Sequence, residues 1–350
     1  MDGYKVLVSD ENLANEDMVT WQTKEYDKIA KKEVKGRFCF ICGNEVSSFC
    51  NSHTIPAFML KYIAIDGHLK SYGALAQNPL DKGKKGVKQA GTFKLICRTC
   101  DSKLFQMYEN EANYGNVKMI NQLLGEIALK TILKTISKRL YEKKMYELIL
   151  EDIYHSPINH FLNEMIHGKL LDLKQLNRDY QYLTSNIYNI EEFKILFYLK
   201  LPYRVSVAVQ DMINLTCDFD GNIINNIFDM SNDNTLYPFY ICVFPLKCER
   251  HIIIFSRKDI NIYNKFFLQL SKKTIYEQLQ LINYLIIENL EDYFINEKID
   301  TSSLEDSARR LPIIQGTALI NSLDSITIYN KDYFSPDKWS SLYNLLDNKL

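Results

Sequence analysis

The chain has 350 residues, of which 46% are hydrophobic, 12% aromatic and 24% charged, and its net charge is −1. This is ordinary globular composition, and it excludes a disordered or collagen-like protein. Two domains are expected for this length. The first residues show no basic start followed by an apolar run, and the apolar segments are too short to span a bilayer. We therefore expect a cytoplasmic protein without a secretory signal or a membrane segment.

Positive and negative charges are unevenly distributed along the chain. Between Lys24 and Lys103 there are 15 Lys and Arg against 7 Asp and Glu. This segment is therefore basic, and the rest of the chain is acidic. Such asymmetry indicates a module that binds a polyanion such as DNA, joined to a part with another task. The alternative is a drift in charge from amphipathic helices that has no binding role.

The N-terminal third is predicted to contain an arm and a compact module. Polar residues dominate 1–37, with a weak helical signal at 25–35, so we expect an N-terminal arm there. Residues 38–115 are rich in Cys, Gly and short strand-like runs, and they contain all the recognisable motifs. This stretch is therefore predicted to be the first folded domain.

A helical extension is predicted for 116–190. Apolar residues recur at helical spacing from 117 to 149, which predicts one long helix or two. Further helices are expected at 158–166, ended by Gly168, and at 171–182.

The C-terminal part, 191–350, is predicted to be a mixed α+β domain. Strands are predicted from short runs of β-branched and aromatic residues at 195–199, 205–209, 239–244 and 251–255. Helices are expected again at 259–270 and 273–296. The sequence of this part contains no phosphate-binding loop and no metal-binding motif. We expect a regulatory or sensor domain that contacts a partner protein or a second copy of the chain.

Two CxxC pairs carry the strongest chemical signal. Cys39 and Cys42 form the first pair, and Cys97 and Cys100 form the second. Each pair places two thiolates on one tight turn, and four thiolates complete a tetrahedral zinc site. Disulfides are not expected in a cytoplasmic chain, and neither pair lies in a βαβ unit as a redox CxxC would. We predict a structural Zn²⁺, with Cys50 in place of one ligand as the alternative.

Other residues follow the two pairs in a recognisable order. The first pair is followed by Ser52-His53-Thr54-Ile55-Pro56, and the second is followed directly by Asp101. In this order, CFICG…SHTIP…CRTCD, the chain resembles the CxxC-containing branch of the HNH nuclease family across 38–112. The resemblance implies an α+β fold in which a zinc-stapled ββα-metal finger and its helical extension precede the C-terminal domain. Ser52 stands where many members have Asp, Glu or His, and Asp101 stands where Asn is usual.

The resemblance also implies an activity: metal-dependent hydrolysis of DNA phosphodiesters, with Mg²⁺ or Mn²⁺ as the catalytic cation. The C-terminal part resembles that of bacterial HNH-like proteins, some of which act in defence against phage, so a role in such defence is an expectation. His53 would be the general base, and Asp101 would orient it or approach the metal. Glu109, placed further along the same helix, would supply a second carboxylate. Structural roles stay open: a zinc-adjacent His53, an N-capping Asp101 and a solvated Glu109. His68 is expected to face solvent.

Basic residues between and within the CxxC pairs are candidates for contacts with phosphates. They are Lys82, Lys84, Lys85, Lys88 and Arg98. Lysines interleaved with glycines predict a mobile cationic loop suited to phosphates rather than bases. The alternative is a solvated surface loop. Two rival functions follow for the protein: a non-catalytic zinc finger that binds nucleic acid or protein, and a zinc-stapled scaffold that binds no nucleic acid.

Overall fold

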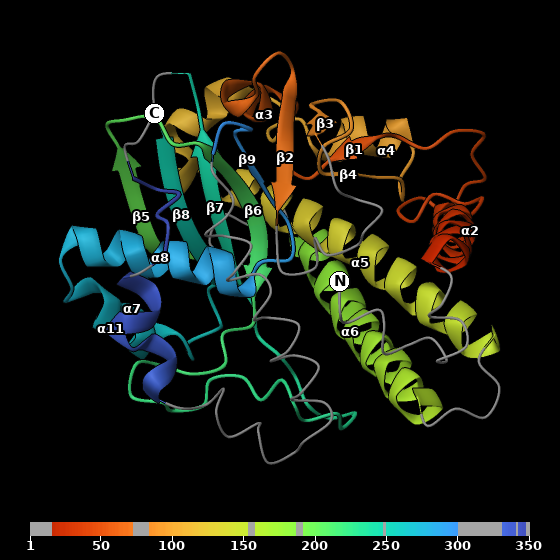
Figure 1. Ribbon diagram of the computed structural model, residues 1–350. Coiled ribbons are helices and arrows are strands. Elements are labelled where there is room, and N and C mark those ends of the chain that lie inside the picture. The colour runs from red at the N-terminus through yellow and green to blue at the C-terminus, as the bar shows by residue number, and fades with distance from the viewer. Residues whose placement is uncertain are drawn as a thin grey trace.

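A computed structural model of the chain describes residues 16–72, 84–152, 158–186, 192–247, 250–299, 331–340 and 342–347. Its centre is a seven-stranded sheet with the order β3-β2-β9-β6-β7-β8-β5 (Figure 1). All neighbouring strands of this sheet are antiparallel. The mixed α+β class expected from the sequence is therefore confirmed.

The strands of the C-terminal part lie where the apolar runs predict them. The seven strands are β2 (His68–Tyr72), β3 (Lys84–Gly86), β5 (Phe193–Leu201), β6 (Val207–Ile213), β7 (Phe239–Pro245), β8 (Arg250–Arg257) and β9 (Tyr293–Ile295). Strands β7 and β8 are buried along nearly their whole length. Both faces of the sheet are thus covered, which explains the unbroken apolar run of β8, Ile252-Ile253-Ile254-Phe255.

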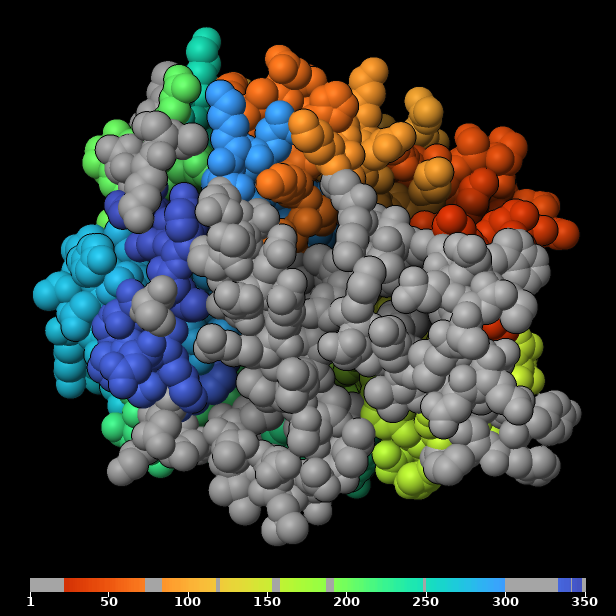
Figure 2. Space-filling model, viewed as in Figure 1, coloured from red at the N-terminus to blue at the C-terminus, as the bar shows by residue number. Residues whose placement is uncertain are grey.

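Strands β2 and β3 come from the part of the chain that carries the CxxC pairs. Lys70 of β2 lies opposite Ile295 of β9, and β9 in turn pairs with β6. One sheet therefore runs across the domain boundary placed at 115. Figure 2 shows the same relation at the surface, where the orange atoms of the N-terminal module lie beside the light-blue atoms around β9.

Two long helices, α5 (Asn121–Asp152) and α6 (Ile158–Asn186), lie side by side (Figure 1). The long helix predicted from 117 is confirmed as α5. The helix end predicted at Gly168 is wrong, because α6 continues through this residue. A Cβ at Gly168 would lie 3.2 Å from Cε of Met230. This glycine therefore allows the loop at 218–234 to approach the helix, rather than ending it.

Apolar residues form a core on each face of the sheet. One core joins α5, the cysteine-containing module and sheet residues such as Tyr240 and Phe255. The other core lies under α7 (Asn264–Ser271), α8 (Ile275–Asn289) and α11 (Pro336–Ser340). The N-terminal module and the sheet therefore share one core, so their stabilities are coupled.

The predicted N-terminal arm contains a long helix, α2 (Glu16–Lys35). Ala30 is completely buried against Met145 and Leu148, two residues of α5. The described portion of the arm is thus docked on the helical extension. Among the described residues, no helix combines the length and the apolar character needed to cross a bilayer.

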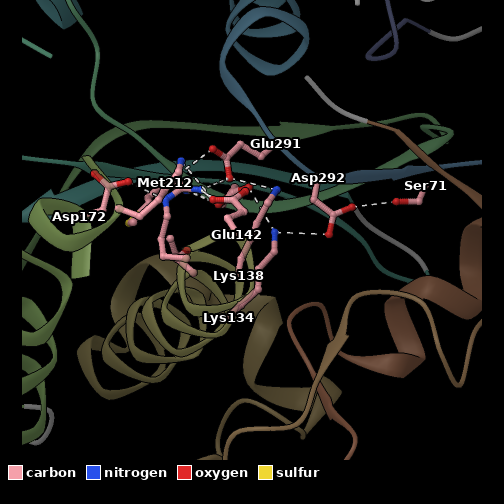
Figure 3. A network of polar contacts seen from close by, with 12 residues as sticks. Ser71, Lys134, Lys138, Glu142, Asp172, Met212, Glu291 and Asp292 are labelled. Atoms are coloured by element: carbon pink, nitrogen blue, oxygen red, sulfur yellow. Dashed lines mark hydrogen bonds and ion pairs between the residues drawn. The ribbon is translucent and has the colours of Figure 1, made fainter. Parts of the chain in front are cut away.

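Ion pairs fix the segment between α8 and β9, which the sequence predicts to be helical as far as 296. Glu291 accepts hydrogen bonds from Arg139 of α5, with the shorter N···O distance at 2.7 Å, and Asp292 lies 3.5 Å from Lys134 of the same helix. Figure 3 shows Glu291 and Asp292 facing the side chains of Lys134 and Lys138 of α5. The prediction of one continuous helix is wrong, because the backbone after Asp292 pairs in the sheet as β9 instead.

Gly91, in the cysteine-containing module, lies close to the ring of Phe294 in β9. Its φ is +62°, and a Cβ there would lie 2.9 Å from the ring of Phe294. Gly91→Ala is expected to lower the free energy of unfolding by more than the ~1–2 kcal/mol cost of a left-handed backbone alone. Gly67→Ala is the matched control, because Gly67 also has positive φ but nothing within 4 Å of its Cβ position. Urea unfolding of both variants measures the difference, and equal losses would contradict a contact with Phe294.

Candidate metal centre and adjoining site

The four predicted cysteines come together as one cluster. The Sγ atoms of Cys39, Cys42, Cys97 and Cys100 all lie within 4.8 Å of one another. Zn–S bonds of about 2.3 Å imply S···S separations of roughly 3.8 Å in a tetrahedron, so this donor set fits Zn²⁺. Gly43, at φ +67°, closes the first turn, and its N–H donates to the carbonyl of Cys39 at 2.8 Å. The four cysteines predicted from the sequence are therefore brought together and are positioned to bind one metal ion.

The sulfur atoms differ in their readiness to ionise. Burial raises the pKa of Cys39, but backbone N–H groups, among them those of Cys42 and Cys97, outweigh burial and lower it to about 6. Burial and the neighbouring thiols raise the pKa of Cys100 well above its ordinary value. The cluster thus contains one thiol that ionises easily and another that a neighbouring cation must help to deprotonate. Metal binding at such a site releases protons.

Short regular elements surround the cluster. Strand β1 (Ser52–His53) pairs with β4 (Thr92–Phe93) in antiparallel fashion, and α4 (Arg98–Leu104) follows. Cys97 is the N-cap of α4, and its Sγ accepts from the N–H of Cys100 at 3.4 Å. Strands of two residues are too short to identify a fold family. The described structure thus confirms a cysteine cluster within an α+β fold.

His53 is held in one orientation by the turn at 87–91. Its Nε2–H donates to the carbonyl oxygen of Val87 at 3.0 Å. Because a carbonyl only accepts, Nε2 carries the proton, and the neutral ring keeps its lone pair on Nδ1. No described residue is hydrogen-bonded to Nδ1. Burial, with a smaller contribution from the charge of Lys130, lowers the pKa of His53 below its ordinary value.

Asp101 lies next to the strand of His53 but does not contact the ring. Its Oδ1 accepts from the hydroxyl of Ser52 and from Nζ of Lys130, each at 2.6 Å, and its Oδ2 accepts from Sγ of Cys50 at 3.4 Å. Burial opposes its ionisation, but Lys130 dominates and lowers the pKa of Asp101. This carboxylate therefore fixes Ser52, the residue before His53. Asp101 is not the N-cap of α4, because Cys97 holds that position.

Lys130 is the residue of this site that sequence reasoning missed. It comes from α5, its side chain is 0% exposed, and its Nζ lies 3.9 Å from the ring centroid of Phe105. A buried lysine is rare without a partner, and here Asp101 provides the opposite charge. One sequence feature could have identified Lys130 as buried: it lies on the apolar stripe of α5, between Ile127 and Leu133.

Glu109 lies beyond α4, which ends at Leu104. The expectation that Glu109 belongs to the same helix as Asp101 is therefore wrong. Its side chain is 46% exposed, and its carboxylate lies 3.9 Å from Nζ of Lys130. Partial burial and the nearby charge of Asp101 raise the pKa of Glu109, whereas Lys130 opposes the rise. Glu109 is thus the more accessible of the two carboxylates around Lys130.

The carboxylates of Asp101 and Glu109 do not fit a catalytic divalent cation as they are placed. The ammonium group of Lys130 contacts both of them, and it already supplies their positive counter-charge. Within the described residues, the four cysteines are also the only group of three or more metal-binding side chains close enough to share one ion.

The predicted phosphate contacts fall into different surroundings. Residues 84–86 form β3 rather than a mobile loop, and Lys84 lies 2.9 Å from Glu297. Lys88 and Arg98 are exposed, and Lys85 is half-buried in β3. Lys82 lies outside the described residues. Among the predicted phosphate contacts, two exposed cations without a described ion pair are therefore Lys88, whose carbonyl accepts from Asn51, and Arg98 at the start of α4.

The exposure predicted for His68 is confirmed. Cys217 and Cys242, which lie outside the cluster, are completely buried thiols. Comparison with protein-family models, with curated proteins and with solved structures found no match for this chain. The likeness to HNH nucleases therefore depends on the motif residues alone.

Proposed function

We propose that the cysteine-containing module hydrolyses phosphodiester bonds of nucleic acid, with DNA as the substrate and His53 as the general base. The observation that supports this most is the bond from Nε2 to the carbonyl of Val87. It leaves Nδ1 as the basic atom and fixes the direction of its lone pair. A general base needs both a free lone pair and a fixed geometry.

The proposed chemistry requires few groups. A water molecule at Nδ1 of His53 would lose a proton to the ring while its oxygen attacks phosphorus. The bond from phosphorus to the leaving sugar oxygen would break, and that oxygen would take a proton from solvent. Since the pKa of His53 is lowered, the ring is neutral and ready to accept this proton at neutral pH. Lys88 and Arg98 would hold the phosphates through their charges. Asp101 acts by fixing Ser52, the residue before the base.

A catalytic Mg²⁺ or Mn²⁺, which the HNH resemblance implies, has no fitting donor set in this arrangement because Lys130 lies between the two carboxylates. No step of the proposed mechanism therefore uses such an ion, and the cleavage assay is run with and without it.

The expected role in defence against phage, and a regulatory partner of the C-terminal part, belong to the same proposal. The shared sheet would connect such a partner to the site through β9.

Replacing His53 by alanine tests the proposal. His53→Ala is expected to reduce DNA cleavage by ~10²–10⁴-fold while zinc content and DNA affinity stay close to wild type, because a general base acts in the transition state. His68→Ala is the control, since this exposed histidine lies outside the site. Supercoiled plasmid, incubated with Mg²⁺, Mn²⁺ or EDTA, gives the cleavage rate. In the wild type this rate should fall only at a pH below the ordinary histidine value of about 6.5.

A second function, a zinc module that binds nucleic acid without cutting it, is favoured by the ammonium of Lys130 between Asp101 and Glu109. The same assay separates the two functions. If the wild type binds DNA but leaves the plasmid intact in every metal condition, the hydrolase proposal fails and the binding module stands.

A further inference from the structure

Helix α2 carries a row of exposed lysines that no step of the proposed mechanism uses. Lys24, Lys28, Lys31 and Lys35 recur at intervals of four, three and four residues. Residues three and four apart lie on the same face of an α-helix, so the four side chains follow one line along α2. All four are exposed, and the side chains of Lys28 and Lys31 are 77% and 67% accessible to solvent. These four residues form the lysine stripe.

The other face of α2 holds the helix on α5. Ala30 packs against Met145 and Leu148, and the amide of Gln22 donates to Asp152 at 2.9 Å. At about 3.6 residues per turn, Gln22 and Ala30 lie on the side of α2 away from the lysine stripe. The stripe is therefore turned away from α5, on a helix whose position is fixed before any partner binds.

Two acidic residues of α2 are engaged by α5. Asp27 accepts from the hydroxyl of Tyr141 at 2.7 Å, and Glu33 lies 3.3 Å from Nζ of Lys144. Positive and negative side chains are thus unevenly divided around α2, and the face turned away from α5 is the cationic one.

The ion pairs within the stripe are weak competitors for a partner. Lys31 lies 2.8 Å from Asp27, and Lys28 lies 3.8 Å from Glu25. An ion pair to a mostly exposed lysine contributes little to stability, so a phosphate can replace the carboxylate. In the part of the chain that the structure describes, no carboxylate lies within ion-pair distance of Lys24 or Lys35. The stripe thus keeps most of its positive charge for a partner.

The dimensions of the stripe fit a phosphate backbone. Eleven residues separate Lys24 from Lys35, which is about 16 Å along the helix at ~1.5 Å per residue. Phosphates of one DNA strand are spaced by about 3.4 Å along the duplex axis, so the stripe spans roughly five base pairs. Lysines bind phosphates as flexible point charges and read no base sequence by doing so.

The stripe leads to the cysteine cluster, which the proposed phosphate contact Arg98 also adjoins. Lys35 precedes Cys39 by four residues, and Arg98 directly follows Cys97. The N–H of Cys97 donates to Sγ of Cys39 at 3.3 Å. One end of the lysine stripe and Arg98 are therefore attached to two cysteines that contact each other, so both can serve one strand.

A lipid surface is the other extended polyanion that lysines contact. A helix that binds in the bilayer interface needs a broad apolar face turned toward the lipid. The apolar contact of α2 at Ala30 is used on α5, and among the described side chains of α2 only Ile29 is large, apolar and exposed. Charge without such a face favours nucleic acid.

We propose that the lysine stripe binds the phosphates of a DNA duplex without sequence preference and so extends the substrate surface of the cysteine-containing module. The assignment rests on the proposed function, which takes DNA as the substrate. It adds a second surface, on the N-terminal arm, to the contacts at Lys88 and Arg98.

The experiment measures binding of a fluorescein-labelled duplex of about 20 base pairs by anisotropy, in EDTA and at several salt concentrations. The stripe variant replaces the four lysines by glutamine, which removes the charges and is still a good helix former. At ~100 mM salt its affinity should be roughly tenfold or more below wild type, by a similar factor for duplexes of unrelated sequence. The dependence of log Kd on log salt should become shallower by roughly 3–4 units, because each lost phosphate contact removes about one.

A second variant with the same loss of charge is the matched control. It replaces four exposed lysines outside α2 and the cysteine-containing module by glutamine, namely Lys174, Lys247, Lys272 and Lys338. This variant should bind DNA with an affinity and a salt dependence close to wild type. An equal loss of affinity in both variants would reduce the effect to net charge and overturn the assignment.

The outcomes separate the stripe from the proposed hydrolysis. Unchanged affinity and salt dependence in the stripe variant would overturn the stripe but leave hydrolysis standing, since Lys88 and Arg98 could hold the substrate alone. Stripe-dependent DNA binding by a protein that leaves plasmid intact would support the stripe and sink the hydrolase. Vesicles containing phosphatidylglycerol, bound by wild type but not by a stripe variant of normal DNA affinity, would assign the stripe to a membrane instead. A wild type that binds no DNA would overturn both proposals.

Discussion

Cys97→Ser is expected to release the metal and to prevent folding of the whole chain. Structural zinc in isolated fingers contributes on the order of 10 kcal/mol, whereas domains are typically stable by only ~5–15 kcal/mol. Cys97 belongs to the core that joins the cysteine-containing module, α5 and the sheet. Loss of the metal should therefore not stay confined to the module, as it would in a finger on a flexible linker.

The measurement combines metal analysis with thermal unfolding. Wild type should carry close to one zinc per chain, and Cys97→Ser should carry none and be recovered mainly in aggregates. Cys50→Ser is the matched control, because Cys50 lies outside the cluster and its thiol donates to Asp101, which a serine hydroxyl can also do. A soluble, folded Cys97→Ser without zinc would show that the metal is dispensable. Zinc loss in Cys50→Ser instead would change the ligand set.

Local patterns predicted the elements whose periodicity is strong. The strands β5 to β8 and the helix α5 lie close to their predicted positions because burial on both faces, or a sustained apolar stripe, leaves a clear signature. The CxxC spacing predicted the cysteine cluster for a similar reason, since the chemistry of zinc restricts both residue type and spacing.

Long-range pairing decided what the patterns could not. Helical propensity after 289 continues in the sequence, but pairing with β2 and β6 turns 293–295 into a strand. Gly168 predicted a helix end, but α6 continues through it, and the glycine instead allows a close approach by Met230. Local sequence patterns could not predict that Lys130 and Asp101, which lie on different helices, form an ion pair beside the strand of His53. Only part of the site could therefore be predicted from the sequence.

Lys130→Met should destabilise the fold through an uncompensated charge. Asp101 would remain largely enclosed, with 16% of its side chain exposed, after losing the ammonium at 2.6 Å. Breaking a buried ion pair by removing one partner typically costs about 3–5 kcal/mol. Asp101→Asn added to Lys130→Met should restore much of the loss, because a neutral pair leaves no buried charge and the amide can still bond Ser52.

Urea unfolding of the two single variants and the double variant gives the coupling free energy between the residues. Lys103→Met serves as the control, since Lys103 is exposed on the helix that carries Asp101. If Lys130→Met is as stable as Lys103→Met, the ion pair is unimportant to the fold. Recovery in the double variant, with DNA cleavage still reduced, would show that the pair positions His53 through Ser52 as well as stabilising the core. Full recovery of both stability and cleavage would restrict Lys130 to a structural role.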